Sequence, residues 1–129
     1  MNHGLMPFPN QAKGPLLRAA LLLDATALTV DGVGPTAGQH YGQAGVRSAA
    51  NIARVLYNGT GDFTVFFQDP MPDNRFMVVA TCRDAGATPH LITVSGSDTA
   101  LTDRKRFSVV TRSGGAAANL TELHLLFYA

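Results

Sequence analysis

The chain from residue 51 onward alternates short apolar runs with polar connections that contain glycine, proline, asparagine or aspartate. Short apolar runs bounded by turn residues are typical of β-strands. The predicted strands are 51–58, 62–68, 75–84, 90–95, 106–112 and 120–128. Many short strands without a convincing helix predict an all-β fold, an antiparallel β-sandwich of jelly-roll-like type.

The first two of these strands are predicted to form a hairpin. Gly59-Thr60-Gly61 separates them, and glycine supplies the positive φ angles that tight turns need. The next connection, DPMPDN, combines two prolines with two aspartates and an asparagine, so we expect an irregular turn there.

Residues 17–50 are harder to assign. The run 17–31 is compatible with a helix or with a short hairpin that turns at Asp24-Ala25-Thr26, and the β-rich remainder favours strands. Residues 32–50 hold five glycines among small side chains, which predicts a long loop or two weak strands with too few large apolar groups to form core.

The first sixteen residues differ in character from the rest. They contain three prolines and two glycines among isolated apolar residues, which predicts an extended arm over 1–16 attached to a sandwich domain over 17–129. Leu5, Met6 and Phe8 are apolar anchors with which this arm would dock on a neighbouring protein.

The predicted strands are apolar on both faces. Side chains alternate across a strand, so Phe63, Val65 and Phe67 share one face of their strand and form core. The opposite faces of several strands also carry large apolar side chains, namely Phe66, Met77, Val79, Leu126 and Tyr128. Exposed apolar patches invite aggregation, so we expect these five residues to form a homo-oligomer interface. The alternative is that the N-terminal third of the same chain covers them.

Composition supports a covered surface and excludes several function classes. Of 129 residues, 46% are apolar and only 15% are charged, and the net charge is +1. No basic tract suggests nucleic-acid binding, because Arg104, Lys105 and Arg106 form the one basic cluster and fit a solvated loop. No apolar stretch is long enough for membrane insertion, and residues 1–15 lack the pattern of a secretory signal, so we expect assembly in a cytoplasm.

The chemistry of an active site is missing. His3, His40, His90 and His124 are scattered without metal-ligand spacing, and Cys82 is the only cysteine. No nucleophile elbow and no phosphate-binding loop occur. We therefore expect a non-enzymatic protein without catalytic, cofactor or metal sites. A small polysaccharide hydrolase built on scattered carboxylates is the weaker alternative.

One segment carries a family resemblance. Its motif is a strand ending in Asn-Gly-Thr-Gly-Asp, an aromatic residue and Thr, followed by a Phe-ending strand, Met-Pro-Asp and an aromatic-led strand. The positions are Asn58, Gly59, Thr60, Gly61, Asp62, Phe63, Thr64, Phe67, Met71, Pro72, Asp73 and Phe76. The segment 51–84 resembles a module found near the C-termini of bacteriophage tail fibres, and a looser likeness covers roughly residues 45–129. The resemblance implies a β-sandwich knob, usually trimeric, on the outside of a virion, and it implies no catalytic residues.

The absence of a shaft is a departure from the fibre pattern and leaves two virion roles open. Fibre proteins place this module after a long shaft, but no heptad or collagen-like repeat occurs in this sequence. We therefore expect a homotrimeric capsid decoration (cement) protein that binds the major capsid protein or other virion proteins, with 1–16 as the capsid-docking arm. The alternative is a tail-fibre tip, collar or receptor-binding knob protein that contacts the host surface through loops such as 32–47.

Overall fold

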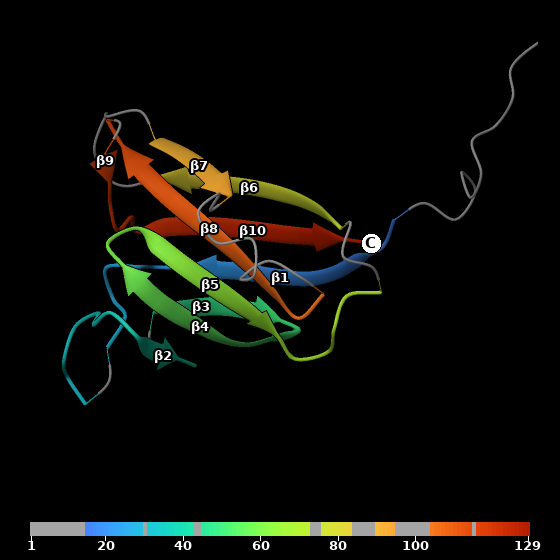
Figure 1. Cartoon of the computed structure of the whole chain (residues 1–129), viewed down its shortest axis with the longest axis horizontal. Coiled ribbons are helices and arrows are strands. Elements are labelled where there is room, and N and C mark those ends of the chain that lie inside the picture. The colour runs from blue at the N-terminus through green and yellow to red at the C-terminus, as the bar shows by residue number, and fades with distance from the viewer. Residues whose placement is uncertain are drawn as a thin grey trace, which may run out of the picture.

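Two antiparallel sheets pack against each other and form a β-sandwich (Figure 1). The structure is a computed structural model that describes residues 15–29, 31–42, 45–72, 76–83, 90–94, 104–114 and 116–129. All regular elements within these ranges are strands, so the predicted all-β sandwich is confirmed. None of the described segments forms a helix that could cross a bilayer.

The smaller sheet has four strands and the larger sheet has six. The four-stranded sheet has, in spatial order, β3 (Val46–Ala50), β1 (Leu17–Leu23), β10 (Glu122–Tyr128) and β6 (Met77–Arg83). The larger sheet has β2 (Gln39–Tyr41), β4 (Ile52–Gly59), β5 (Asp62–Phe67), β8 (Arg106–Ser113) and β7 (His90–Val94), and β9 (Ala116–Ala117) pairs with β8. The first long strand and the last one, β1 and β10, lie side by side in the four-stranded sheet.

The strands predicted from residue 51 onward are all present, and 17–50 contributes three more. Residues 17–23 form a strand that ends at a turn on Asp24, whose side chain accepts a hydrogen bond from the Thr26 amide at 3.0 Å. The predicted hairpin across this turn is wrong, because the strand that pairs with β1 is β3, with Leu23 opposite Val46. The two weak strands considered for 32–50 are confirmed as β2 and β3.

The core lies between the sheets and takes its buried apolar side chains mainly from one face of β1, β4, β5, β8 and β10. Phe63, Val65 and Phe67 of β5 are buried, as the alternation predicts, and the rings of Phe67 and Phe127 meet edge to face at 4.9 Å across the two sheets. Two core residues lie in segments from which the sequence predicts no contribution to the core. Tyr41 and Met71 are fully buried, because a short strand and a turn each fold one large side chain inward.

Asn51 forms the corner between the sheets. It joins β3 to β4 with a φ of +56°, a conformation that asparagine tolerates better than most residues. Its side-chain amide donates to the carbonyl oxygens of Arg18 and Asp69, and its side-chain oxygen accepts a hydrogen bond from the Asp69 amide at 2.7 Å. These bonds connect the end of β3 to both sheets.

The glycine of the β4–β5 hairpin has a specific packing role. Gly61 has a φ of +69°, and a Cβ atom there would lie 2.5 Å from the carbonyl oxygen of Thr111. The Gly61 amide donates to the Asn119 side chain at 2.8 Å, and Asn119 in turn donates to the Tyr57 hydroxyl at 3.1 Å. The Asn-Gly-Thr-Gly-Asp motif therefore has a structural explanation in this turn.

The N-terminal arm falls almost entirely outside the described residues. The anchors Leu5, Met6 and Phe8 are among the residues not described. Pro15 and Leu16 are described, and Leu16 exchanges two backbone hydrogen bonds of 3.0 Å with Ala129. The ladder between β1 and β10 therefore continues to the point where the arm begins.

Candidate functional site

The outer face of the four-stranded sheet is the candidate functional surface. Strand register places its side chains in rows that run across β1, β10 and β6. The first row is Leu17, Tyr128 and Met77, the second is Ala20, Leu126 and Val79, and the third is Leu22, His124 and Thr81. Two rows of this face are therefore apolar from strand to strand.

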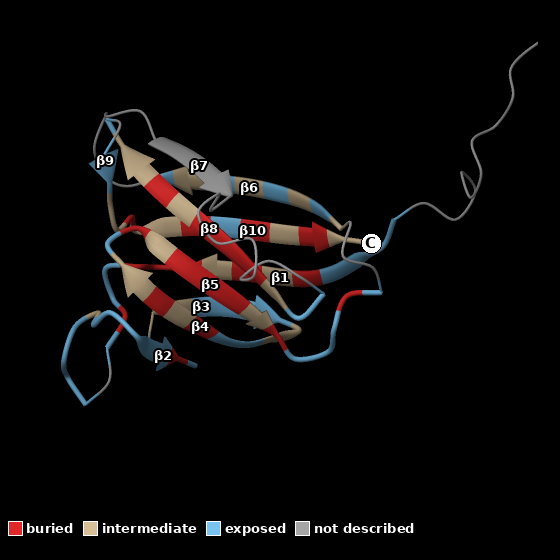
Figure 2. Ribbon diagram, in the orientation of Figure 1, coloured by how far each residue is buried: buried red, intermediate tan, exposed pale blue. Residues whose placement is uncertain are grey.

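These apolar side chains are left open to solvent. Met77 is 58% exposed, Val79 is 50% exposed and Leu17 is 54% exposed, while Leu126 and Tyr128 are half-buried. Figure 2 shows that β6 carries no fully buried residue along its length. A patch of this kind on a folded domain is typical of an interaction site.

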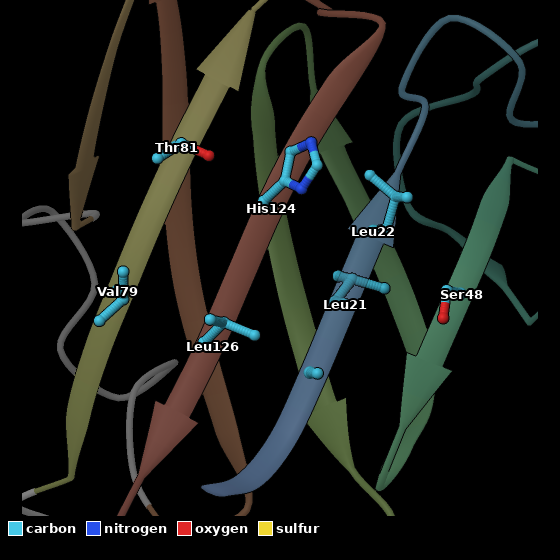
Figure 3. A pocket seen from close by; sticks show the side chains of 8 residues that line it. Leu21, Leu22, Ser48, Val79, Thr81, His124 and Leu126 are labelled. Atoms are coloured by element: carbon cyan, nitrogen blue, oxygen red, sulfur yellow. The ribbon is translucent and has the colours of Figure 1, made fainter.

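The face is hollowed at its centre. A depression of about 380 Å³ lies over β1, β10 and β6 and extends to β3. Its lining residues are Ala20, Leu21, Leu22, Ser48, Val79, Thr81, His124 and Leu126 (Figure 3). Small side chains at Ala20 and Ser48 stand beside larger ones, so the hollow can receive a bulky apolar side chain. The hydroxyls of Ser48 and Thr81 and the ring of His124 add polar groups to its wall.

The far end of the same face is charged. Arg83 of β6 and Glu122 of β10 are cross-strand partners and form a two-pronged ion pair, with Arg83 Nη2 donating to Glu122 at 3.1 Å. The hydrogen bond from Arg83 is the main reason why the pKa of Glu122 is lowered. His124 Nε2 lies 3.4 Å from the same carboxylate. The face thus runs from an apolar end beside the arm to a polar end at Arg83 and Glu122.

Four of the five residues predicted as an oligomer interface meet on this face, and the fifth does not. Met77, Val79, Leu126 and Tyr128 are neighbours, whereas Phe66 lies on the outer face of the larger sheet. Alternation along a strand identifies a residue on the second face of its strand. It does not identify the sheet to which the strand belongs, and this is why Phe66 was grouped with the others.

Phe66 lies instead in a cluster with Arg54 and His40. The Arg54 guanidinium lies 4.2 Å from the centre of the Phe66 ring, and its Nε donates to His40 Nδ1 at 3.1 Å. The rings of His40 and Phe66 are 5.7 Å apart. A cation stacked on an aromatic face is a stabilising contact within the chain, so Phe66 already has a partner.

The buried carboxylate of Asp24 has a structural role. Burial alone would raise its pKa, but hydrogen bonds from Thr26 and from Arg47, whose Nη2 lies 2.8 Å away, outweigh burial, so the pKa of Asp24 is lowered. Cys82 packs partly buried against the core, where burial raises the pKa of its thiol.

The described residues contain no group of three histidine, cysteine or carboxylate side chains that could hold a metal ion. His40 and His124 lie on different sheets, and the side chains of His3 and His90 are not described. In the basic cluster, Arg104 and Lys105 are exposed in the turn before β8, and Arg104 Nε donates to the carbonyl oxygen of Met71 at 2.8 Å.

Sequence reasoning missed the contribution of β1 to the apolar face. Leu17, Ala20 and Leu22 belong to it, but their segment was ambiguous between helix and strand, so no face could be assigned to them. In the structure, Ala19, Leu21 and Leu23 are buried and alternate with less buried residues, which is the period of a strand, but the uninterrupted apolar run in the sequence does not show this alternation.

A scan against protein-family models found no match, and neither did searches of curated proteins and of solved structures.

Proposed function

We propose that this chain is a structural protein of a bacteriophage particle, a homotrimeric capsid decoration protein that stabilises the head. The observation that carries the proposal is the apolar outer face of the four-stranded sheet, where Met77 and Val79 are at least half exposed. Such a face favours a protein that is completed by copies of itself and by a larger assembly. The resemblance of residues 51–84 to a virion module supports a phage particle as the larger assembly.

In this role each copy would stabilise the capsid only slightly, and the full array of copies would stabilise it strongly. A decoration protein holds neighbouring capsid subunits together through contacts that are weak singly and add up because one trimer binds several sites at once. The low share of charged residues, 15%, fits a surface that is mostly covered on the particle. The partner would be the major capsid protein, and the work of the protein would be mechanical.

The direct test is reconstitution on phage heads that lack the protein. Purified chain should bind over the whole head in a fixed ratio to the major capsid protein, and decorated heads should release their DNA at a higher temperature than bare heads. A variant with Val79→Asp should bind poorly, while Thr60→Asp, an exposed turn position far from the apolar face in sequence, should bind normally. The absence of binding to heads by the unaltered chain would refute the decoration role.

A second candidate, a tail-fibre tip, collar or receptor-binding knob, is favoured by one observation. The Arg54 and His40 pair is exposed on the other sheet, and His40 lies within the 32–47 segment that such a role would use to contact the host. The two roles predict different results for Arg54→Ala. A receptor-binding knob should lose binding to host envelopes, whereas a decoration protein should still coat heads.

A further inference from the structure

The apolar face is too small to hold a trimer by sheet-to-sheet contact alone. Strands of seven residues at about 3.3 Å per residue, in four strands about 4.8 Å apart, give a face of roughly 23 Å by 19 Å, or about 440 Å². Stable protein interfaces bury about 800 Å² on each partner. A trimer that uses this face therefore needs a further contacting segment.

The N-terminal arm starts beside the apolar end of this face. Leu16 pairs with Ala129, and the next residues of the two strands, Leu17 and Tyr128, form the first apolar row together with Met77. The arm therefore begins where the exposed apolar side chains are concentrated, at the end away from Arg83 and Glu122.

The sequence of the arm is chemically suited to the hollow in this face. Residues 1–14 contain Leu5, Met6 and Phe8, one lysine and no acidic residue. Such side chains match the apolar rows, and a hollow of about 380 Å³ has room for large ones. Prolines in the arm favour extended backbone whose carbonyl oxygens stay available, and the Thr81 and Ser48 hydroxyls in the wall of the hollow can donate to them.

The arm is long enough to reach a neighbouring copy. The two hydrogen bonds between Leu16 and Ala129 hold Leu16 in line with β1. A proline at position 15 disfavours helical angles in Gly14, so the sequence favours extended backbone ahead of β1. Phe8 is eight residues before Leu16, a reach of about 26 Å in extended backbone, which is enough to cross to an adjacent copy.

We propose that residues 5–8 of each copy dock into the hollow on the four-stranded sheet of the next copy, which closes the trimer by exchange of arms. This inference rests on the proposed trimer and assigns the arm to a second copy of this chain, where the sequence alone suggested the capsid. A head-to-tail contact of this kind closes into a ring when the rotation between copies is one third of a turn.

The test is a disulfide between two copies. With Cys82→Ser in the background, one population carries Phe8→Cys and another carries Val79→Cys, and the two are mixed and oxidised. The mixed disulfide should form roughly tenfold or more faster than with Thr60→Cys in place of Val79→Cys, because docking raises the effective concentration of the thiols. Equal rates for the two partners overturn the proposal. So does a chain carrying both Phe8→Cys and Val79→Cys that links only to itself.

Removal of the arm gives an independent readout. A chain lacking residues 1–12, and a full chain with Leu5→Ser, Met6→Ser and Phe8→Ser, should both sediment as monomers with an unchanged β-sheet circular dichroism spectrum. Trimers that persist in both variants overturn arm exchange and leave the decoration role standing. A full chain that is monomeric before any change overturns both arm exchange and the proposed trimer.

Discussion

The outer faces of the two sheets differ in whether their side chains have partners within the chain. On the larger sheet, outward side chains find partners within the chain: Thr64 shares a hydrogen bond of 3.0 Å with Ser108, and Phe66 lies under the Arg54 guanidinium. On the four-stranded sheet, the corresponding positions at Met77 and Val79 are apolar and open to solvent. Among the described residues, the two outer faces therefore differ in how far their apolar side chains are satisfied within the chain, and this difference supports the proposal that the four-stranded sheet is the side that a partner covers.

The largest effect is expected from charging the apolar face. Val79→Asp combined with Leu126→Asp removes two apolar contacts worth about 1.5–3 kcal/mol each, so self-association should weaken by more than about a hundredfold. Sedimentation equilibrium over a range of concentrations measures this directly. The matched control is Ala53→Asp with Thr60→Asp, two exposed positions on the other sheet, and unchanged association is expected there. Equal weakening by both pairs would contradict the assignment of the interface.

The sequence predicts this contrast only in part, and Phe66 shows why. Alternation along β5 and β6 correctly separates core from outward side chains, because the direction of a side chain depends only on local strand geometry. The grouping of strands into sheets depends on long-range pairing. The chain passes from the four-stranded sheet to the larger one at Asn51, a single residue with a positive φ. The flanking sequence contains no glycine or proline that would predict a change of sheet there.

The loops show a similar limit. Tyr41 and Met71 are buried although their segments predict no core, since a single large side chain among glycines or prolines carries no periodic signal. The Tyr41 hydroxyl also accepts a hydrogen bond from the Thr36 amide at 2.9 Å, which anchors the glycine-rich segment to the core. Such isolated contacts follow from the final packing and are not encoded in a local pattern.

Two carboxylates with lowered pKa values, Asp24 just after β1 and Glu122 in β10, differ in their burial. Asp24 is nearly buried and its pKa is lowered below 3.8, so its contribution to stability is complete above that pH and is lost as the pH falls through the folded-state pKa. Asp24→Asn should cost about 1–2 kcal/mol at pH 7 and less at pH 3, because the charged hydrogen bonds are then weakened in the unaltered chain as well. Urea unfolding at both pH values measures the difference.

Glu122 is the control for this experiment. Its pKa is lowered in the same direction by Arg83, but the pair lies at the exposed rim of the face. Solvent screens such pairs, so Glu122→Gln should leave the pH dependence of unfolding almost unchanged. A loss of acid sensitivity in Glu122→Gln that equals the loss in Asp24→Asn would show that burial is not what distinguishes the two carboxylates.

The hydrogen-bonded pair Thr64 and Ser108 on the larger sheet should contribute to the stability of the fold but not to self-association. Thr64 is fully buried, and its hydroxyl accepts a hydrogen bond from Asn58 at 2.9 Å in addition to its contact with Ser108. Thr64→Val removes both bonds at constant volume and should destabilise the fold by about 1–3 kcal/mol. Thr64→Ser keeps the hydroxyl and should restore most of the bonding. Chemical denaturation gives the stabilities, and an unchanged sedimentation profile is expected for both variants.

The smallest effect on stability is expected from changes at Phe66. The same changes test whether the proposed interface is confined to the four-stranded sheet. Phe66→Leu keeps an apolar side chain but removes the ring under Arg54, a contact worth about 0.5–1 kcal/mol at an exposed site. The stability should fall by no more than that, and Arg54→Gln should produce a similar loss, since either change removes the same stacking. Self-association should be unaffected by both, because the proposed interface lies on the opposite sheet. If Phe66→Leu weakened association as strongly as a single Val79→Asp change, both outer faces would take part in assembly, and the larger sheet would need a partner as much as the smaller one does.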